Sequence, residues 1–436
     1  MKSFEVTGGC RLSGEITPQG AKNEALQVIC AVLLTEEEVI ISNVPDITDV
    51  RLLIGMLEDL GVQVNRISTD TYSFKAADVA IDRMYDSSFM EKAMRLRGSV
   101  MLAGPLLSRY RKSVIPKPGG DKIGRRRMDT HITGFQKLGA SVDYDHDGGY
   151  FRLSAASLTG ADILLDEPSV TGTANLVMAA VMADGQTTIY NAACEPYVEQ
   201  LCTMLNKMGA DISGVRSNLL TISGVKELKG CSHHLLPDMI ETGSFLGLAA
   251  ITGSSLRIKN AGIQHLGIIP DKFRQLGIQF HYEDDDIVVP EQEIYEIQNN
   301  VDGSILTIYD HPWPGLTPDL ISVLLVVAVQ ARGSVLIHQK MFESRLFFVD
   351  KLIDMGARII LCDPHRATVI GLERRQQLRG ITMNSPDIRA GMALLIASLS
   401  AEGTSLIHNI EQIDRGYQYL DQRLNSLGAS IRRIDS

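Results

Sequence analysis

The chain has 436 residues, of which 44% are hydrophobic and 22% charged, and its formal net charge is −10. This length exceeds one ordinary hydrophobic core and indicates a globular protein of two or more domains. The acidic balance argues against a protein that coats nucleic acid. The longest apolar run, residues 320–331, is too short to cross a bilayer and predicts a buried helix.

The cysteines and the first ten residues indicate the cellular compartment of the protein. Six cysteines lie far apart, without the spacing of a zinc site or of a disulfide framework. The stretch MKSFEVTGGC lacks the apolar core of a signal peptide. We therefore expect a cytoplasmic protein with reduced thiols, no metal and no membrane partner.

One order of predicted elements recurs along the chain. Residues 20–65 predict an apolar helix, a strand, a second helix and a further strand. The same order returns from the segments SVTGTANLVMAAV, DMIETGSFLGLAA, PDLISVLLVVAVQ and PDIRAGMALLIAS. Because each first helix is apolar nearly all round, we expect these helices to be buried, with the sheets outside them.

A Leu-Gly or Met-Gly pair ends the second helix of each repeat. Each glycine suits the position after a helix, where a left-handed backbone is needed. The six glycines, spaced by 68 to 79 residues, are Gly61, Gly139, Gly209, Gly277, Gly356 and Gly428. Six repeats divide into three plus three, which predicts an α/β fold of two similar globules with a ligand site in the cleft between them.

A glycine-hinged basic loop stands out in this acidic chain. Residues 109–127 contain eight Lys and Arg residues against one carboxylate, Asp121. Such a local concentration of positive charge indicates an anion site, although a solvated loop is the simpler interpretation. A site for nucleic-acid ends is disfavoured, because Tyr110 is the loop's one aromatic residue and bases need rings to stack on.

Several motifs together resemble the UDP-N-acetylglucosamine 1-carboxyvinyltransferase family of enolpyruvyl transferases. They are, in chain order, PQGAKNEAL, LRGSVMLAGPL, PGGDKIGRR, TPDL, FESR, SPDIRAG and IDRGY. The resemblance covers essentially the whole chain. It implies two inside-out, barrel-like α/β domains of three βαβαββ-type repeats each, with the active site in the inter-domain cleft. By the same resemblance residues 1–21 join the C-terminal globule, 22–236 form the domain with the basic loop, and 237–436 form the C-terminal domain.

The resemblance also implies a reaction. The family transfers the enolpyruvyl group of phosphoenolpyruvate to the 3′-hydroxyl of UDP-N-acetylglucosamine and releases phosphate, by addition and then elimination. This step begins peptidoglycan precursor synthesis and needs no metal or cofactor, and nucleic acid is no partner. Two alternatives stay open: transfer to shikimate 3-phosphate, whose enzyme usually has a Ser-Lys pair where this chain has Ala21 and Lys22, and a non-catalytic sugar-nucleotide sensor.

The N-terminal half supplies one set of implied site residues. Lys22 is expected to contact phosphoenolpyruvate and to take part in catalysis, and Asn23 to contact the sugar or the reaction intermediate. Arginine suits phosphate because its planar fork binds two oxygens at once, and Arg97 and Arg126 have this role by resemblance. Two segments are expected to line the nucleotide, the first Arg126, Arg127, Met128, Asp129 and Thr130, the second Glu167, Pro168, Ser169 and Val170 at a predicted helix start.

The C-terminal half supplies the implied base. Asp238, Asp319 and Asp387 each follow proline at the start of a repeat helix, so spacing alone gives each the role of a helix N-cap. Resemblance selects Asp319 as the group that takes the hydroxyl proton. It also assigns a sugar contact to the main chain at Met341, and carboxylate and phosphate contacts to Arg345, Arg389 and Arg415.

Asp121 departs from the commoner family pattern, which has cysteine at this position. We expect Asp121 to deliver the proton to the enol carbon. A free aspartate has a pKa of about 3.9, so it must become protonated only when the loop covers the substrates. Fosfomycin inactivates the family by alkylating the cysteine thiolate, and a carboxylate is a weaker nucleophile, so the resemblance implies insensitivity to this compound.

Overall fold

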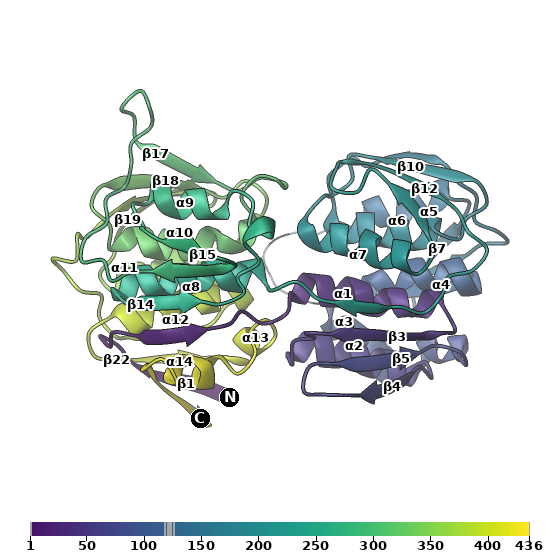
Figure 1. Ribbon diagram of the computed structural model, residues 1–436, viewed down its shortest axis with the longest axis horizontal. Coiled ribbons are helices and arrows are strands. Elements are labelled where there is room, and N and C mark those ends of the chain that lie inside the picture. The colour runs from purple at the N-terminus through teal and green to yellow at the C-terminus, as the bar shows by residue number, and fades with distance from the viewer. Residues whose placement is uncertain (1, 117–118, 120–123, 125–126, 436) are drawn as a thin grey trace. The chain divides into compact units, whose positions relative to one another are not determined.

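The computed structural model describes residues 2–116, 119, 124 and 127–435, and the chain folds into two compact units (Figure 1). Unit 1 contains Met1–Gln19 and Pro237–Ser436, and unit 2 contains Gly20–Gly120 and Arg126–Leu236. Each unit has three small sheets among the described residues. Asp121 and Arg126, both predicted site residues, lie outside the described part of the chain.

Unit 1 has three four-stranded sheets, and each combines one parallel strand pair with two antiparallel pairs. In sheet order the strands are β21 (Thr382–Asn384), β22 (Thr404–His408), β1 (Lys2–Thr7) and β23 (Ser430–Asp435); β15 (His281–Glu283), β16 (Asp286–Val289), β14 (Ser255–Ile258) and β2 (Ser13–Ile16); and β17 (Leu306–Tyr309), β18 (Ser334–His338), β20 (Arg366–Ile370) and β19 (Arg358–Asp363). Strands β1 and β2 come from the start of the chain and join sheets built by its second half.

Unit 2 repeats this plan with two four-stranded sheets and one three-stranded sheet among the described residues. The strands, in sheet order, are β13 (Ser232–His234), β3 (Glu38–Ser42), β5 (Tyr72–Lys75) and β4 (Gln63–Arg66); β11 (Asp211–Ser213), β12 (Leu219–Ser223), β10 (Gln186–Tyr190) and β9 (Asp162–Leu164); and β6 (Lys112–Pro116), β8 (Tyr150–Ser154) and β7 (Ser141–Asp145).

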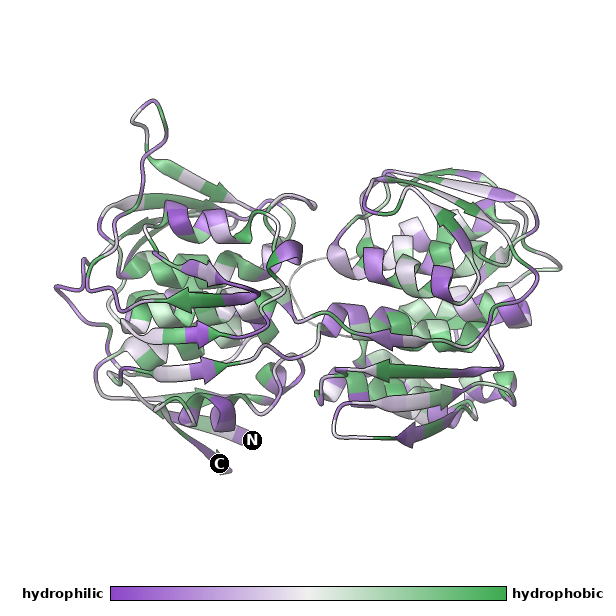
Figure 2. Cartoon of the chain, in the orientation of Figure 1, coloured by the Kyte–Doolittle hydropathy of each residue, from purple (hydrophilic) through white to green (hydrophobic). Residues whose placement is uncertain are grey.

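Apolar helices fill the interior of each unit (Figure 2). In unit 1 these are α8 (Met239–Thr252), α10 (Ile321–Val329) and α12 (Ile388–Ser400), which pack on one another. In unit 2 they include α1 (Lys22–Ala31), α4 (Ala103–Tyr110) and α6 (Val170–Ala180). The outer helices are α2 (Thr48–Asp59), α3 (Ser87–Arg95), α5 (Asp129–Lys137), α7 (Pro196–Lys207), α9 (Ile269–Gln275), α11 (Val349–Asp354), α13 (Glu411–Asp414) and α14 (Leu420–Asn425). The prediction of buried helices inside small sheets is confirmed.

Two glycines of α8 allow the inner helices of unit 1 to approach closely. A Cβ atom at Gly243 would lie 2.6 Å from a Leu320 methyl carbon, and one at Gly247 would lie 2.5 Å from a Val323 methyl carbon. Larger residues would therefore separate α8 from α10, because packed interiors leave no room for extra methyl groups.

The six predicted helix-ending glycines all have the left-handed backbone that the repeat pattern required. Their φ angles lie between 88° and 105°. Each follows an outer helix and turns the chain toward the next strand or extended segment. In the described part of the chain no helix has the length and hydropathy of a membrane span.

A buried glutamate in each unit holds the segment that leads to the other unit. In unit 1 the fully buried Glu241 accepts a hydrogen bond of 2.6 Å from the Gln19 N–H, and Arg423 binds both of its oxygens at 2.7 and 3.0 Å. In unit 2 the fully buried Glu24 accepts from the Leu236 N–H at 3.0 Å and pairs with His233 at 2.8 Å. Both glutamates occupy the third residue of a repeat's first helix.

Removing one partner of the Glu241–Arg423 pair should strongly lower the free energy of unfolding. Replacing Arg423 with methionine leaves a buried carboxylate without its cation, which costs about 3–5 kcal/mol. Arg432→Met is the control, because it removes a solvent-exposed pair with Glu5 that contributes less than about 1 kcal/mol. Urea unfolding at neutral pH measures both variants, and equal losses would contradict the expectation.

Candidate active site

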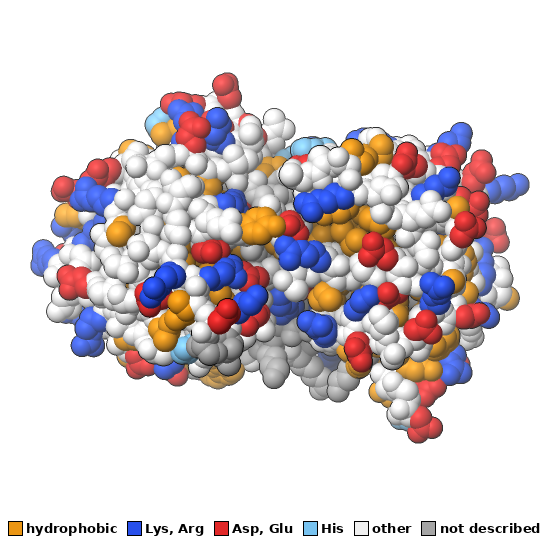
Figure 3. Space-filling view, turned by 90° about the horizontal axis from the view of Figure 1, so that it is seen from below, with side chains coloured by type: hydrophobic (Ala, Val, Ile, Leu, Met, Phe, Trp, Pro, Cys, Tyr) orange, Lys and Arg blue, Asp and Glu red, His pale blue; other side chains and the backbone are white. Residues whose placement is uncertain are grey.

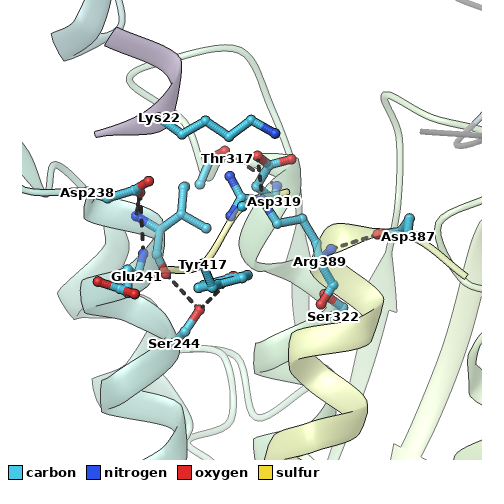
Figure 4. A network of polar contacts seen from close by, with 12 residues as sticks. Lys22, Asp238, Glu241, Ser244, Thr317, Asp319, Ser322, Asp387, Arg389 and Tyr417 are labelled. Atoms are coloured by element: carbon cyan, nitrogen blue, oxygen red, sulfur yellow. Dashed lines mark hydrogen bonds and ion pairs between the residues drawn. The ribbon is translucent and has the colours of Figure 1, made fainter. Parts of the chain in front are cut away.

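Asp319 is the centre of a charged network in unit 1 (Figure 4). Arg345 Nη2 lies 2.5 Å from Asp319 Oδ1, and Arg389 Nε lies 3.0 Å from Asp319 Oδ2. Both arginine side chains are almost fully buried, whereas the Asp319 side chain keeps 18% of its surface exposed. Both oxygens of the Asp319 carboxylate are thus held by guanidinium groups, while part of the side chain stays accessible.

The three aspartates at equivalent repeat positions have different roles. Asp238 caps α8 by accepting from the N–H groups of Ile240 and Glu241, and Asp387 caps α12 in the same way. Asp319 is no cap, so the interpretation from spacing alone is wrong at this position. Thr317 accepts from the Asp319 N–H instead, and Asp319 lies inside a short 3₁₀ turn, Pro318–Leu320. Because Thr317 makes the cap, the Asp319 carboxylate is available to the arginines.

The two arginines retain buried donors that make no hydrogen bond among the described residues. These are Nε and Nη1 of Arg345 and Nη1 of Arg389, and Arg345 Nη1 lies 3.8 Å from Asp387 Oδ1 in a long ion pair. Burial alone lowers the pKa of Arg389, but the neighbouring Asp319 carboxylate reverses this effect and holds the pKa well above its usual value. Buried cationic donors without acceptors are costly, so the site is suited to an anionic ligand.

Arg415 and Met341 complete the predicted residues of unit 1. Arg415 follows α13 and donates to the Gln412 side chain at 2.9 Å. The Met341 N–H donates to Asp310 Oδ2 at 3.1 Å, and the adjacent Lys340 N–H donates to Oδ1 of the same carboxylate. Burial raises the pKa of Asp310, and these backbone N–H groups oppose the rise. Asp310 thus fixes the main chain at Met341, a role that sequence reasoning missed although Asp310 directly follows a strand.

Lys22 begins α1 in unit 2 and is paired with a residue that sequence reasoning also missed. Its Nζ lies 2.7 Å from Asp49 Oδ2, and both side chains are buried. Asp49 is in the first turn of α2, directly after the loop that follows β3. The ion pair fixes the position of the Lys22 ammonium group. Asn23 is half-buried in the same first turn of α1.

The remaining described residues of unit 2 gather at the N-termini of α5 and α6. Arg97 donates to the Arg127 carbonyl at 3.3 Å, just before α5. Thr130 of α5 donates to Asp166 Oδ1 at 3.1 Å. Asp129 and Glu167 are exposed, and Met128, Pro168, Ser169 and Val170 are half-buried.

Ser169 caps α6 by accepting from the Gly172 N–H, so the predicted helix start at this segment is confirmed. Unpaired N–H groups at such helix starts favour anions.

No group of three His, Cys, Asp or Glu residues in the described ranges has a metal-binding arrangement. Among the described residues, unit 1 contains a carboxylate held between two arginines. Unit 2 contains a lysine and two helix N-termini. These groups can bind anions and move a proton.

Comparison with known proteins agrees with this chemistry. Residues 6–424 match the family model for EPSP synthase (3-phosphoshikimate 1-carboxyvinyltransferase). The UDP-N-acetylglucosamine 1-carboxyvinyltransferases of Bacteroides fragilis and Porphyromonas gingivalis are 64% and 63% identical to the chain, each over 100% of both sequences.

A solved structure shows the same fold. The enolpyruvyl transferase NikO from Streptomyces tendae has a TM-score of 0.87 and 22% identity, covering 100% of this chain and 99% of its own. The full-length match to the family model and to these relatives leads to one conclusion: the chain belongs to the enolpyruvyl transferase family.

Proposed function

We propose that the protein transfers the enolpyruvyl group of phosphoenolpyruvate to the 3′-hydroxyl of UDP-N-acetylglucosamine, in the cytoplasm, as the step that begins peptidoglycan precursor synthesis. The observation that carries the mechanism is the Asp319 network, in which a partly exposed carboxylate is held by two buried arginines. The choice of acceptor is supported by full-length relatives of that name at 63–64% identity.

Asp319 acts in this proposal as the general base that takes the proton from the acceptor hydroxyl. The donors of Arg345 and Arg389 that make no hydrogen bond in the structure bind the carboxylate or phosphate of phosphoenolpyruvate and stabilise charge during addition. Asp310 holds the Met341 main chain for a contact with the sugar. Each group belongs to unit 1 and is positioned before substrate arrives.

Unit 2 supplies the nucleotide and phosphate contacts in this proposal. Lys22, positioned by Asp49, contacts phosphoenolpyruvate, and the α5 and α6 N-termini bind the nucleotide. Asp121, which is outside the described residues, delivers the proton to the enol carbon. The support for its role is its place in the PGGDKIGRR motif.

Two other functions were considered beside this one. Transfer to shikimate 3-phosphate is the activity named in the description of the matching family model, whereas the full-length relatives at 63–64% identity are named for UDP-N-acetylglucosamine. A nucleic-acid protein is disfavoured by charge, because on the face in Figure 3 the coloured Lys and Arg side chains are interspersed with Asp and Glu side chains.

Phosphate release tests the proposed reaction directly. The purified protein is given phosphoenolpyruvate with UDP-N-acetylglucosamine, and in parallel with shikimate 3-phosphate. We expect release with the sugar nucleotide alone. Release only with shikimate 3-phosphate would overturn the acceptor, and binding of the sugar nucleotide without release would identify a sensor.

Asp319→Asn should separate catalysis from binding. Loss of a general base lowers kcat by about 10²- to 10⁴-fold. We expect the Kd for UDP-N-acetylglucosamine, measured by calorimetry, to stay within about threefold of the wild-type value. The substitution removes one charge and keeps the volume of the side chain.

Asp238→Asn is the matched control for Asp319→Asn, since Asp238 has the equivalent repeat position and asparagine caps a helix nearly as well as aspartate. Its kcat should stay within about threefold of the wild type, in line with a cap change of a few tenths of a kcal/mol. Comparable losses of kcat in the two variants would refute a special role for Asp319.

Asp121 should determine the response to fosfomycin. The wild type should keep its activity after incubation with the compound, because a carboxylate attacks an epoxide far more slowly than a thiolate does. Asp121→Cys should remain active and become inactivated, with the mass of the adduct found on the new cysteine. Asp121→Asn should lose turnover because an amide cannot donate the required proton. An active Asp121→Cys enzyme that is not alkylated, or near-normal turnover of Asp121→Asn, would contradict this assignment.

A further inference from the structure

Gln19 connects the first part of the chain to its last part through its side-chain amide. It lies in the PQGAKNEAL motif, just before α1, and is 7% exposed. Its Nε2 donates to the Gly416 carbonyl at 2.8 Å, and its Oε1 accepts from the Gln418 N–H at 2.7 Å. One side chain therefore bonds the main chain on both sides of Tyr417.

The orientation of the Gln19 amide is fixed by these two partners. A carbonyl oxygen can only accept and a backbone N–H can only donate, so the amide nitrogen must face Gly416 and the amide oxygen must face Gln418. The bond to Gly416 is buried and the bond to Gln418 is partly buried. Loss of the amide would leave a main-chain group without its partner in a place that water reaches poorly, which is costly.

The main chain of Gln19 is itself fixed to the start of α8. Its N–H donates to Glu241 Oε2 at 2.6 Å, and its carbonyl accepts from the Asp238 N–H at 2.8 Å. Glu241 is held in turn by Arg423. All four polar atoms of Gln19 therefore have partners in unit 1, and the amide extends from a rigid base.

Tyr417, between the two bonded residues, contacts the Asp319 network (Figure 4). Tyr417 is 1% exposed, and its hydroxyl lies 3.3 Å from Ser244 Oγ of α8. The guanidinium carbon of Arg389 lies 5.5 Å from the centre of the Tyr417 ring, which is a cation–π distance. Arg389 in turn binds Asp319 Oδ2. The position of the Tyr417 main chain therefore affects the position of Arg389.

Arg415 directly precedes Gly416 on the same segment. A Cβ atom at Gly416 would lie 2.3 Å from Ile388 Cγ2, so the backbone here packs closely on the residue before Arg389. A shift of this segment would move the start of the Arg415 side chain and disturb the packing beside Arg389. The resemblance described above assigns carboxylate and phosphate contacts to both arginines.

We propose that Gln19 is a positioning residue for phosphoenolpyruvate binding, because its amide fixes the segment that carries Arg415 and packs beside Arg389. This assignment rests on the proposed function. Gln19 acts through the main chain of Gly416 and Gln418 and not by contact with the substrate. Without the amide, the two arginines depart from the geometry that a carboxylate or phosphate requires, and the affinity for phosphoenolpyruvate falls.

The test compares full-length variants that lose equivalent bonds in different places. Gln19→Met keeps the length of the side chain and removes both bonds. Asn425→Leu is the matched control, because Asn425 Nδ2 donates to the Ile431 carbonyl at 2.8 Å and its Oδ1 accepts from the Ile431 N–H at 2.9 Å. Asn425 belongs to the same unit, at the end of α14, but bonds a different segment.

Initial rates of phosphate release with saturating UDP-N-acetylglucosamine give kcat and the KM for phosphoenolpyruvate. In Gln19→Met this KM should rise roughly tenfold. The kcat should stay within about threefold, because Asp319 keeps its contact with Arg345. The Kd for UDP-N-acetylglucosamine, measured by calorimetry without phosphoenolpyruvate, should stay within about twofold.

Two further variants separate positioning from stability. Asn425→Leu should keep kcat, KM and Kd within about twofold of the wild type, even if its urea midpoint falls as far as that of Gln19→Met. Gln19→Asn, whose amide is one methylene too short to reach both partners, should raise the KM for phosphoenolpyruvate by at least about threefold. This variant decides the question if Gln19→Met does not fold.

Three results would overturn the assignment. They are an unchanged KM for phosphoenolpyruvate in a folded Gln19 variant, an equal rise of this KM in Asn425→Leu, and a parallel rise of the Kd for UDP-N-acetylglucosamine. A wild-type protein that releases no phosphate with UDP-N-acetylglucosamine would instead refute the proposed function on which the assignment depends.

Discussion

Helices that are apolar on every side must be enclosed, and both units are organised by this requirement. Every residue of α10 and α12 is buried, and so is every residue of α8 except the last. None of these helices can therefore lie on the surface. The sheets supply the cover, and glycines such as Gly243 and Gly247 let the helices meet closely. What remains accessible on such helices is their ends, where the backbone N–H groups are unpaired. The candidate site residues are accordingly found at helix starts and in the loops beside them.

Repetition presents the same helix start several times, and the structure uses it for different purposes. At Asp238 and Asp387 the carboxylate satisfies backbone N–H groups. At Asp319 a neighbouring threonine makes the cap, and the carboxylate is bound by Arg345 of the same repeat and Arg389 of the next. At this position the carboxylate is available for chemistry because Thr317 makes the cap.

Much of the fold can be predicted from local sequence patterns. Helix-ending glycines such as Gly61 and Gly428 need a left-handed backbone, and helices without a polar face need burial, so neither conclusion depends on distant residues. The site was less predictable from residues alone. Spacing could not distinguish Asp319 from Asp238, because the difference lies in contacts with Arg389, 70 residues away.

The missed residues share this long-range character. Asp49 and Asp310 act through partners 27 to 31 residues away. No local motif encodes such pairings. They emerge only when repeats pack and their loops converge.

The position of β1 has a consequence for how the chain is made. This first strand lies between β22 and β23, the last two strands, with both of its neighbours antiparallel to it. During synthesis β1 leaves the ribosome first but can gain neither partner until residues near 404 and 430 have followed. Unit 2, which ends at Leu236, has all its strands much earlier. The nascent chain therefore holds an unpaired strand for most of its translation, and unit 1 is the last part to become complete.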